Sequence, residues 1–229
     1  VDNSNLYNRL FTTMIKCWRD KWQVGEFPFY FVQIAPYDYG DAENSSAFLR
    51  EAQLKTLSTA RNTGMAVTMD IGNPKDIHPI NKQDVGKRLA LWAFAKTYNI
   101  SVPAYSGPVY KSHKIEGNKI RVLFDYAADG LTFKGDRLKG FTIAGKDMQF
   151  KEADAVIEKN CVVVSSKLID KPAAVRFAFT NTDESNLFNS AGLPATSFRT
   201  DNIPFYKPAL SILPSLNREK GEAVIQINC

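Results

Sequence analysis

The stretch Asp70–Pro79, which reads DIGNPKDIHP, holds the side chains of this sequence best suited to catalysis. It contains His78, one of only two histidines in the chain. A neutral imidazole titrates near physiological pH and can take a proton from a hydroxyl nucleophile, while a nearby carboxylate can orient the ring and stabilise its charged form. We therefore interpret His78 as a general base. The competing interpretation is a loop histidine that only hydrogen-bonds to backbone.

Asp76 is the carboxylate that we expect to orient His78. Only Ile77 separates the two residues, and in an extended segment residues two apart project to the same side, so a hydrogen bond between them is feasible. The geometry depends on the turn that Pro74 and Pro79 make. Asp70 is the alternative orienting carboxylate, in which case Asp76 is a loop or helix-entry residue.

The nucleophile that such a base would serve is missing from the sequence. Ser45–Ser46 and Ser165–Ser166 both lack the glycine-flanked strand-to-helix turn that exposes a nucleophilic serine. Ser45–Ser46 suits a helix cap better. The chain therefore carries half an active site.

Gln33 and Tyr37 are the candidate substrate-binding residues. They lie at the exit of an apolar run, where side chains can reach a ligand. For Tyr37 the alternative is simple packing against Pro36, and for Gln33 it is an amide satisfied inside the protein.

The first half of the chain predicts the α/β scaffold that positions these residues. Apolar residues at helical spacing predict a first helix through Trp22, and FPFYFVQIA at Phe27–Ala35 predicts a strand buried on both faces. A helix over Ser45–Arg61 and a short strand over Met65–Met69 follow. Asp70 falls at the carboxyl end of this strand, and Asn81 can cap the helix that begins after His78. His78 is thus predicted on a loop between a strand and a helix.

Beyond Tyr105 the helical period gives way to short alternating runs separated by turn residues, which predict an antiparallel, sandwich-like β unit. The runs are Lys119–Tyr126, Leu138–Ile143, Asn160–Ser165 and Ala174–Phe179. The proline-bearing stretch Ser101–Pro108 marks the junction. We therefore predict two domains, 1–104 and 105–229.

Composition excludes several classes of function. The 29 Lys and Arg residues against 24 Asp and Glu leave a net charge of +5 without a basic stripe, which argues against nucleic-acid binding. Three scattered cysteines form neither a disulfide framework nor a zinc cluster, and we expect Cys17 and Cys161 to be buried. No apolar run approaches the roughly 20 residues of a membrane span. Neither a metal nor a cofactor is expected.

Five segments of the chain resemble sialate O-acetylesterases, which are SGNH-type carbohydrate esterases, and stand in family order. They are Leu10–Trp22 (LFTTMIKCWRDKW), Phe27–Tyr37 (FPFYFVQIAPY), Met65–Ala93 (MAVTMDIGNPKDIHPINKQDVGKRLALWA), Gly107–Tyr110 (GPVY) and Gly192–Asp201 (GLPATSFRTD). A match in several separate segments is far more specific than the Asp-Ile-His pattern alone. The spacing of Asp76 and His78 departs from the Asp-x-x-His that hydrolases of this broad class usually have, which leaves the role of Asp76 open.

The resemblance implies part of a flavodoxin-like three-layer α/β domain followed by an antiparallel β domain. It also implies metal-free hydrolysis of acetyl esters on sialic acid, with a serine nucleophile, a histidine as base and then acid, and oxyanion donors from a glycine amide and an asparagine. Family chains place the serine, glycine and asparagine blocks before the segment that Val1 begins. We therefore predict that this chain alone is inactive and that the missing amino-terminal segment of the same protein completes it. A periplasmic, secreted or lysosomal-type compartment is favoured.

A non-catalytic carbohydrate-binding or assembly module is the main rival hypothesis. In it, aromatic residues of the second half stack on sugar rings: Tyr105, Tyr110, Phe133, Phe141 and Phe150. Arg199 and Asp201 are expected to pair with each other or with the first half. The tail Asn202–Cys229 matches nothing recognisable, and an extra strand pair and a partner-binding segment both remain open.

Overall fold

The computed structural model describes residues 4–40 and 44–205, so most of the tail and Cys229 lie outside the described residues. The first half holds α1 (Ser4–Trp22), β1 (Phe29–Val32), α2 (Ser45–Thr59), β2 (Thr63–Ala66) and α3 (Lys82–Lys96). The second half holds β3 (Val109–Glu116), β4 (Lys119–Asp125), β5 (Leu131–Phe133), β6 (Phe141–Ala144), β7 (Lys151–Glu152), β8 (Asp154–Glu158), β9 (Cys161–Ser165), β10 (Ala174–Phe177), β11 (Leu187–Asn189) and β12 (Phe198–Arg199). The predicted mixed α/β composition is confirmed.

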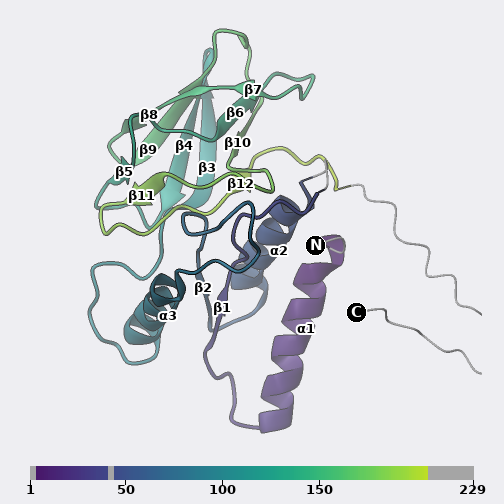
Figure 1. The fold of residues 1–229 in the computed structure, drawn as a ribbon, viewed down its shortest axis with the longest axis vertical. Helices are drawn as coiled ribbons and strands as arrows, with labels where there is room; N and C mark the ends of the chain where they lie inside the picture. The colour runs from purple at the N-terminus through teal and green to yellow at the C-terminus, as the bar shows by residue number, and fades with distance from the viewer. Residues whose placement is uncertain (1–3, 41–43, 206–229) are drawn as a thin grey trace, which may run out of the picture.

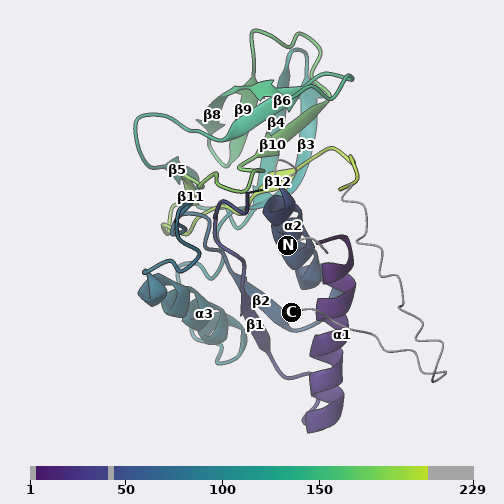
Figure 2. The same ribbon diagram turned by 45° about the vertical axis from the view of Figure 1, so that its right-hand side comes forward.

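In the first half, β1 and β2 form a parallel pair with helices on both faces. The register places Phe29 opposite Thr63 and Val32 opposite Ala66. Figures 1 and 2 show α1 and α2 together on one side of this pair and α3 on the other. Strand β1 is shorter than the predicted run Phe27–Ala35, and β2 begins before the predicted Met65 and ends at Ala66. Val67 and Met69 are buried without belonging to the sheet.

Different side chains hydrogen-bond to the two outer edges of this strand pair. Phe29 donates its backbone N–H to the Asn62 carbonyl just before β2, and Gln33 donates to the Ala66 carbonyl of β2. Tyr30 and Val32, which alternate with these residues, therefore turn their N–H groups outward. The Gln53 side chain accepts from the Ile34 amide at 2.9 Å and donates to the Val32 carbonyl at 3.3 Å. Within the described residues, no strand pairs with this edge of β1.

On the opposite edge, α3 closes β2 with side chains one helical turn apart. The Trp92 indole donates to the Met65 carbonyl at 2.9 Å and the Arg88 guanidinium to the Val67 carbonyl at 2.6 Å. The Met65 carbonyl of β2 and the Val67 carbonyl just after it thus have partners from the helix that follows the strand. Asn81 caps α3 as predicted, because its Oδ1 accepts from the Asp84 amide at 3.1 Å.

Helix α1 forms where the apolar spacing predicts it, but much of its apolar row faces outward. The exposed members of this row are Leu6, Leu10, Trp18 and Trp22. Ile15 and Arg19 are buried instead. The prediction that Cys17 is buried is wrong, because the residue follows the exposed side of α1, whereas Cys161 is buried as expected.

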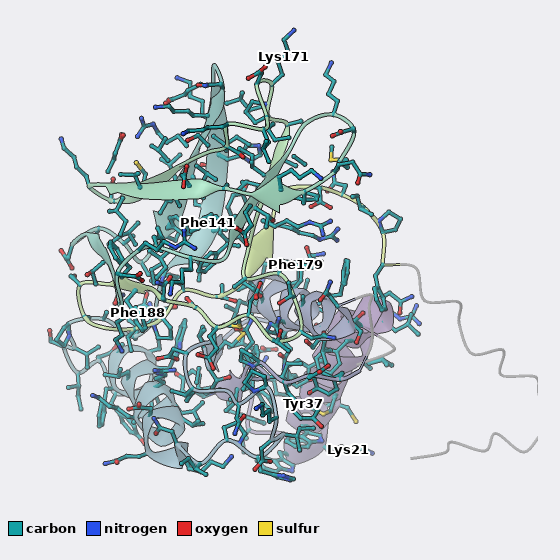
Figure 3. The ribbon with its side chains drawn as sticks, turned by 45° about the horizontal axis from the view of Figure 1, so that its top comes forward. Lys21, Tyr37, Phe141, Lys171, Phe179 and Phe188 are labelled. Carbon is teal, nitrogen blue, oxygen red and sulfur yellow. The ribbon has the colours of Figure 1, made fainter. Side chains whose placement is uncertain are left out.

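The second half is built from antiparallel sheets. Four strands pair in the order β3-β4-β9-β8, four in the order β12-β10-β6-β7, and β11 pairs with β5. Ile120 and Val162 of the first sheet share one core with Ile143 and Val175 of the second. Figure 3 shows Phe141 within these sheets. Strand β6 starts later than predicted, since Gly140 before it has a positive φ of 81°.

The two halves share a single core and are joined by buried polar groups. The apolar cluster runs from Phe31 and Met65 into the antiparallel sheets. Arg50 of α2 is wholly buried and donates to Ser46 at 3.1 Å, to Ser197 at 3.3 Å and to the Thr180 carbonyl. Burial lowers the pKa of Arg50 to about 10.

Backbone also meets backbone at the junction. Gly107 lies so close to Pro194 that a Cβ on Gly107 would be 1.9 Å from the Pro194 carbonyl oxygen. Phe179 lies between the antiparallel sheets and α2 (Figure 3), where its ring meets that of Phe48 edge-on at 5.1 Å. None of the helices in the described ranges is long and apolar enough to cross a membrane.

Asp201 is the centre of a buried ion-pair network, as its predicted partners suggested. Its oxygens accept from Arg176 at 2.7 and 3.0 Å and from Arg199 at 3.2 Å, and Arg199 also pairs with Glu51 of α2. Burial alone would raise the pKa of Asp201, but hydrogen bonds and charges from these arginines outweigh it and hold the pKa below its ordinary value.

Asp201→Asn is expected to lower the free energy of unfolding by about 2 kcal/mol at pH 7, because two guanidinium groups lose their shared anion. Since folding lowers this pKa, the contribution is complete above the unfolded value of about 3.9 and is lost as the pH falls through the folded value. Urea unfolding at pH 7 and pH 3 measures it. A difference between variant and wild type that stays constant on acidification would contradict the assignment.

Candidate active site

His78 and Asp76 lie together on the loop between β2 and α3. The ring Nδ1 of His78 is 3.4 Å from Oδ1 of Asp76, and their side chains are 86% and 55% exposed. The same Asp76 oxygen accepts the backbone N–H of His78 at 2.8 Å. A tight turn thus holds the carboxylate beside the imidazole, and the ring faces solvent at the carboxyl ends of β1 and β2.

Asp70, the alternative orienting carboxylate, is committed elsewhere. Its two oxygens accept from the two terminal nitrogens of Arg88, each at 2.7 Å. Asp76 is therefore the carboxylate that the fold brings to His78. The chain bends at Ile77 and His78 and is not extended as expected, and the Asp76 carboxylate reaches His78 through the turn that its bond to the His78 amide closes. The sequence did not indicate Arg88 as the partner of Asp70. The two residues are 18 positions apart and belong to a loop and a helix, so no local spacing pairs them.

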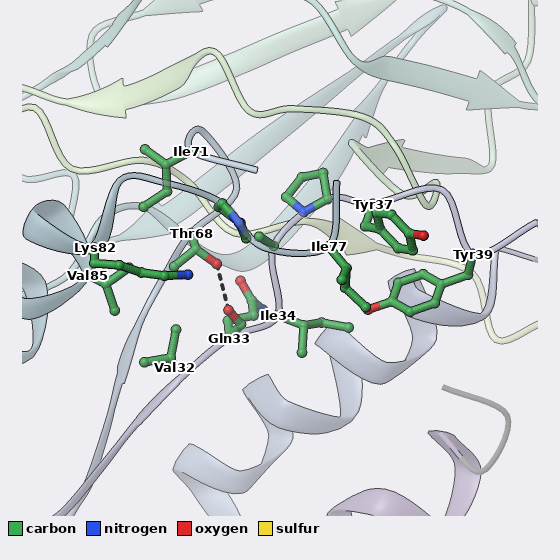
Figure 4. A pocket seen from close by; sticks show the side chains of 13 residues that line it. Val32, Gln33, Ile34, Tyr37, Tyr39, Thr68, Ile71, Ile77, Lys82 and Val85 are labelled. Carbon is green, nitrogen blue, oxygen red and sulfur yellow. Dashed lines mark hydrogen bonds between the residues drawn. The ribbon is translucent and has the colours of Figure 1, made fainter. Parts of the chain in front are cut away.

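A cavity of about 410 Å³ borders the His78 loop. Ile77 and Pro79, on either side of His78, contribute to its wall. Figure 4 shows Lys82 and Val85 of α3 on one side and Tyr37 and Tyr39 on the other. The remaining lining residues are Val32, Gln33, Ile34, Ala35, Pro36, Thr68 and Ile71. The wall is mainly apolar, with a few polar groups, as is common for small-molecule sites.

The two candidate substrate-binding residues occupy different surroundings. Tyr37 is half-buried in the cavity wall, with its ring edge-on to Tyr39 at 4.9 Å. Gln33 borders the cavity but is wholly buried, and its Nε2 donates to the Thr196 hydroxyl at 2.8 Å and to the Arg50 carbonyl at 3.2 Å. Its amide thus points toward the second half of the chain.

The second half also sends a loop to this site, which the sequence did not indicate. The Tyr37 amide donates to the Asn181 carbonyl at 3.0 Å and the Ser185 amide to the Met69 carbonyl at 2.9 Å. Burial raises the pKa of Glu184 on this loop, and the negative charge of Asp70 adds to the rise. No local sequence pattern signals such long-range contacts.

Other chemistry-bearing groups lie away from the site. Ser45 and Ser46 are buried in the first turn of α2. The prediction that they cap this helix is wrong, because the cap position belongs to Asn44. His113 of β3 is half-buried, with its Nδ1 2.8 Å from the Tyr110 hydroxyl. Among residues 4–40 and 44–205, no group of three or more His, Cys, Asp or Glu side chains could hold a metal ion.

Comparison with known proteins confirms the predicted resemblance. No protein-family model matches the chain. Over 133 residues, or 50% of this chain, it is 33% identical to a sialate O-acetylesterase of Mus musculus and 34% to one of Rattus norvegicus. A crystal structure of a carbohydrate acetylesterase from Xanthomonas citri superposes with a TM-score of 0.80 and 42% identity over 86% of this chain. The chain spans 24% of each rodent relative and 46% of the bacterial protein.

Proposed function

We propose that this chain is the carboxyl-terminal part of a serine esterase that removes O-acetyl groups from sialic acid or related acetylated sugars. The observation that carries the proposal is the exposed His78 ring 3.4 Å from Asp76 beside a cavity, in a chain similar to acetylesterases. Because the chain spans only part of those relatives, the serine and the oxyanion donors are assigned to the missing amino-terminal segment of the same protein.

In this mechanism, His78 takes the proton of the serine hydroxyl as the serine oxygen attacks the acetyl carbonyl carbon. Oxyanion donors stabilise the tetrahedral intermediate. His78 then returns the proton to the departing sugar oxygen, which leaves an acetyl-serine. Water, deprotonated by His78, releases acetate and restores the serine. Asp76 holds the ring in orientation and stabilises the imidazolium.

Tyr37 and Gln33 are proposed to contact the sugar or its acetyl group from the cavity. For Tyr37, the support is its place in the cavity wall. Gln33 would act through the part of the residue that borders the cavity, since its amide is already bonded to Thr196 and Arg50. The apolar lining suits a small acetyl group, and no step of this chemistry requires a cofactor or a metal.

The proposed whole is a flavodoxin-like three-layer α/β domain of the SGNH type, of which 1–104 is the last part, followed by a sandwich-like antiparallel domain at 105–229. Two parallel strands are too few to make a sheet of that kind. We assign the outer edge of β1 and the exposed row of α1 to contact with the missing segment. Support comes from the exposure of Trp18 and Trp22, at 46% and 64%, since large exposed apolar patches mark interfaces.

Complementation tests this proposal. The chain and a polypeptide of the residues that precede it in the same protein are purified separately, and release of acetate from O-acetylated sialic acid is measured for each and for the mixture. We expect activity from the mixture alone, because neither part holds both nucleophile and base. A folded, bound mixture without activity, or activity from the chain by itself, contradicts the proposal.

The same measurement distinguishes the esterase from the rival carbohydrate-binding module. Such a module would bind sugar but release no acetate, whether alone or in the mixture. The structure gives that rival little support. Of the five aromatic residues proposed to stack on sugars, Phe141 is buried in the core and Phe150 is covered by the Arg176 guanidinium at 4.0 Å. Phe133, at 39% exposure, is the one of the five that belongs to the exposed large apolar residues.

A further inference from the structure

A bidentate ion pair lies directly beneath the loop that carries His78. Arg88 of α3 and Asp70 are 9% and 10% exposed, and two parallel hydrogen bonds of 2.7 Å join them. Arg88 also donates to the Val67 carbonyl at 2.6 Å. The planar fork of a guanidinium fixes direction as well as distance, which a single-point ammonium does not. One side chain therefore binds the end of β2 to the helix.

The pair joins the two ends of the segment that holds Asp76 and His78. The loop starts at Asp70, after β2 has ended at Ala66, and returns to the scaffold at Asn81, which caps α3 about two turns before Arg88. Between these points the loop has backbone contacts of its own, such as the Asp38 amide to the Pro74 carbonyl at 3.0 Å. The bonds from Arg88 to Asp70 tie the start of this loop to the helix that follows its other end.

We propose that Asp70 and Arg88 are positioning residues that set where the His78 imidazole stands relative to the serine. This inference rests on the proposed function, because it assigns no chemistry to the pair itself. Misplacing a catalytic group by about 1 Å can cost about 10²-fold in rate. The loop's own turns set the position of His78 relative to Asp76, and the ion pair at its base ties the loop to α3.

Arg88→Lys in the full-length protein tests the proposal, because lysine keeps the positive charge but cannot form the two parallel hydrogen bonds to Asp70. We expect kcat per active site, counted by titration with a fluorophosphonate, to fall about 10- to 100-fold while KM changes less than about threefold. Tryptic cleavage after the exposed Lys75 is expected to accelerate. If Arg88→Lys does not fold, Asp70→Asn gives the same comparison with the shape of the carboxylate retained.

Arg176→Lys is the matched control, since Arg176 forms the same two-point pair with Asp201 away from the His78 loop. It is expected to lower the thermal midpoint and leave kcat per titrated site unchanged. Wild-type kcat in Arg88→Lys, or equal losses in both variants, overturns the positioning role. Loss of activity in His78→Ala with full activity in Arg88→Lys would refute this inference alone, whereas an active His78→Ala refutes the proposed function and the inference with it.

Discussion

Replacing His78 with alanine in the full-length protein is expected to lower kcat for acetyl-ester hydrolysis by about 10⁴- to 10⁶-fold, with a small change in KM. Removing the base of a nucleophile–base pair leaves only binding and oxyanion stabilisation, which accounts for the size of the loss. Steady-state release of acetate from O-acetylated sialic acid measures it. Because the side chain is 86% exposed, the substitution should change the free energy of unfolding by less than about 0.5 kcal/mol.

His113→Ala is the matched control for this substitution, because it removes the only other histidine of the chain. His113 lies in β3 and contacts Tyr110, so its loss should leave kcat unchanged. The esterase assignment would be refuted by a folded His78→Ala protein whose kcat lies within about tenfold of wild type.

Gly107→Ala is expected to destabilise the protein by about 4 kcal/mol or more, or to prevent folding. The added Cβ would lie 1.9 Å from the Pro194 carbonyl oxygen and 2.7 Å from its carbonyl carbon. Both atoms belong to backbone, so no rotamer change can relieve the overlap, and the two chain segments must separate. Urea unfolding of the full-length protein, with yield of soluble protein as a second measurement, tests the expectation.

Gly86→Ala provides the comparison for the same change of side chain. Gly86 lies within α3, and a Cβ there meets nothing within 4 Å. Alanine in a helix is favoured over glycine by about 1 kcal/mol, so this variant should be more stable than wild type. A Gly107→Ala protein as stable as Gly86→Ala would show that the approach to Pro194 is not a constraint.

Local features of the fold followed from local sequence. The cap at Asn81 and the helix after it could be predicted because a side chain and an amide three residues away suffice to define them. His78 and Asp76 could be paired because only Ile77 separates them, so their contact also depends on local backbone alone. The strand over Phe27–Ala35 was predicted too long, since an apolar run reports burial and not pairing.

Long-range features could not be predicted in the same way. The exposed row of α1 follows the same helical spacing as a buried face, and only the packing of Ile15 and Arg19 against the rest of the fold distinguishes the two. Arg88 gave no local signal of its partner. The bonds of the Gln33 amide to Thr196, a residue far along the chain, likewise depend on how the two halves meet.

The shared core and the buried Arg50 make the two halves poor candidates for separate transplantation. A chimaera that took its antiparallel half from a distant homologue would need matched acceptors for the Arg50 guanidinium, now supplied by Thr180 and Ser197. It would also need the close passage of Gly107 past Pro194. The smallest unit that protein engineering can exchange intact is therefore both halves together, and not either half alone.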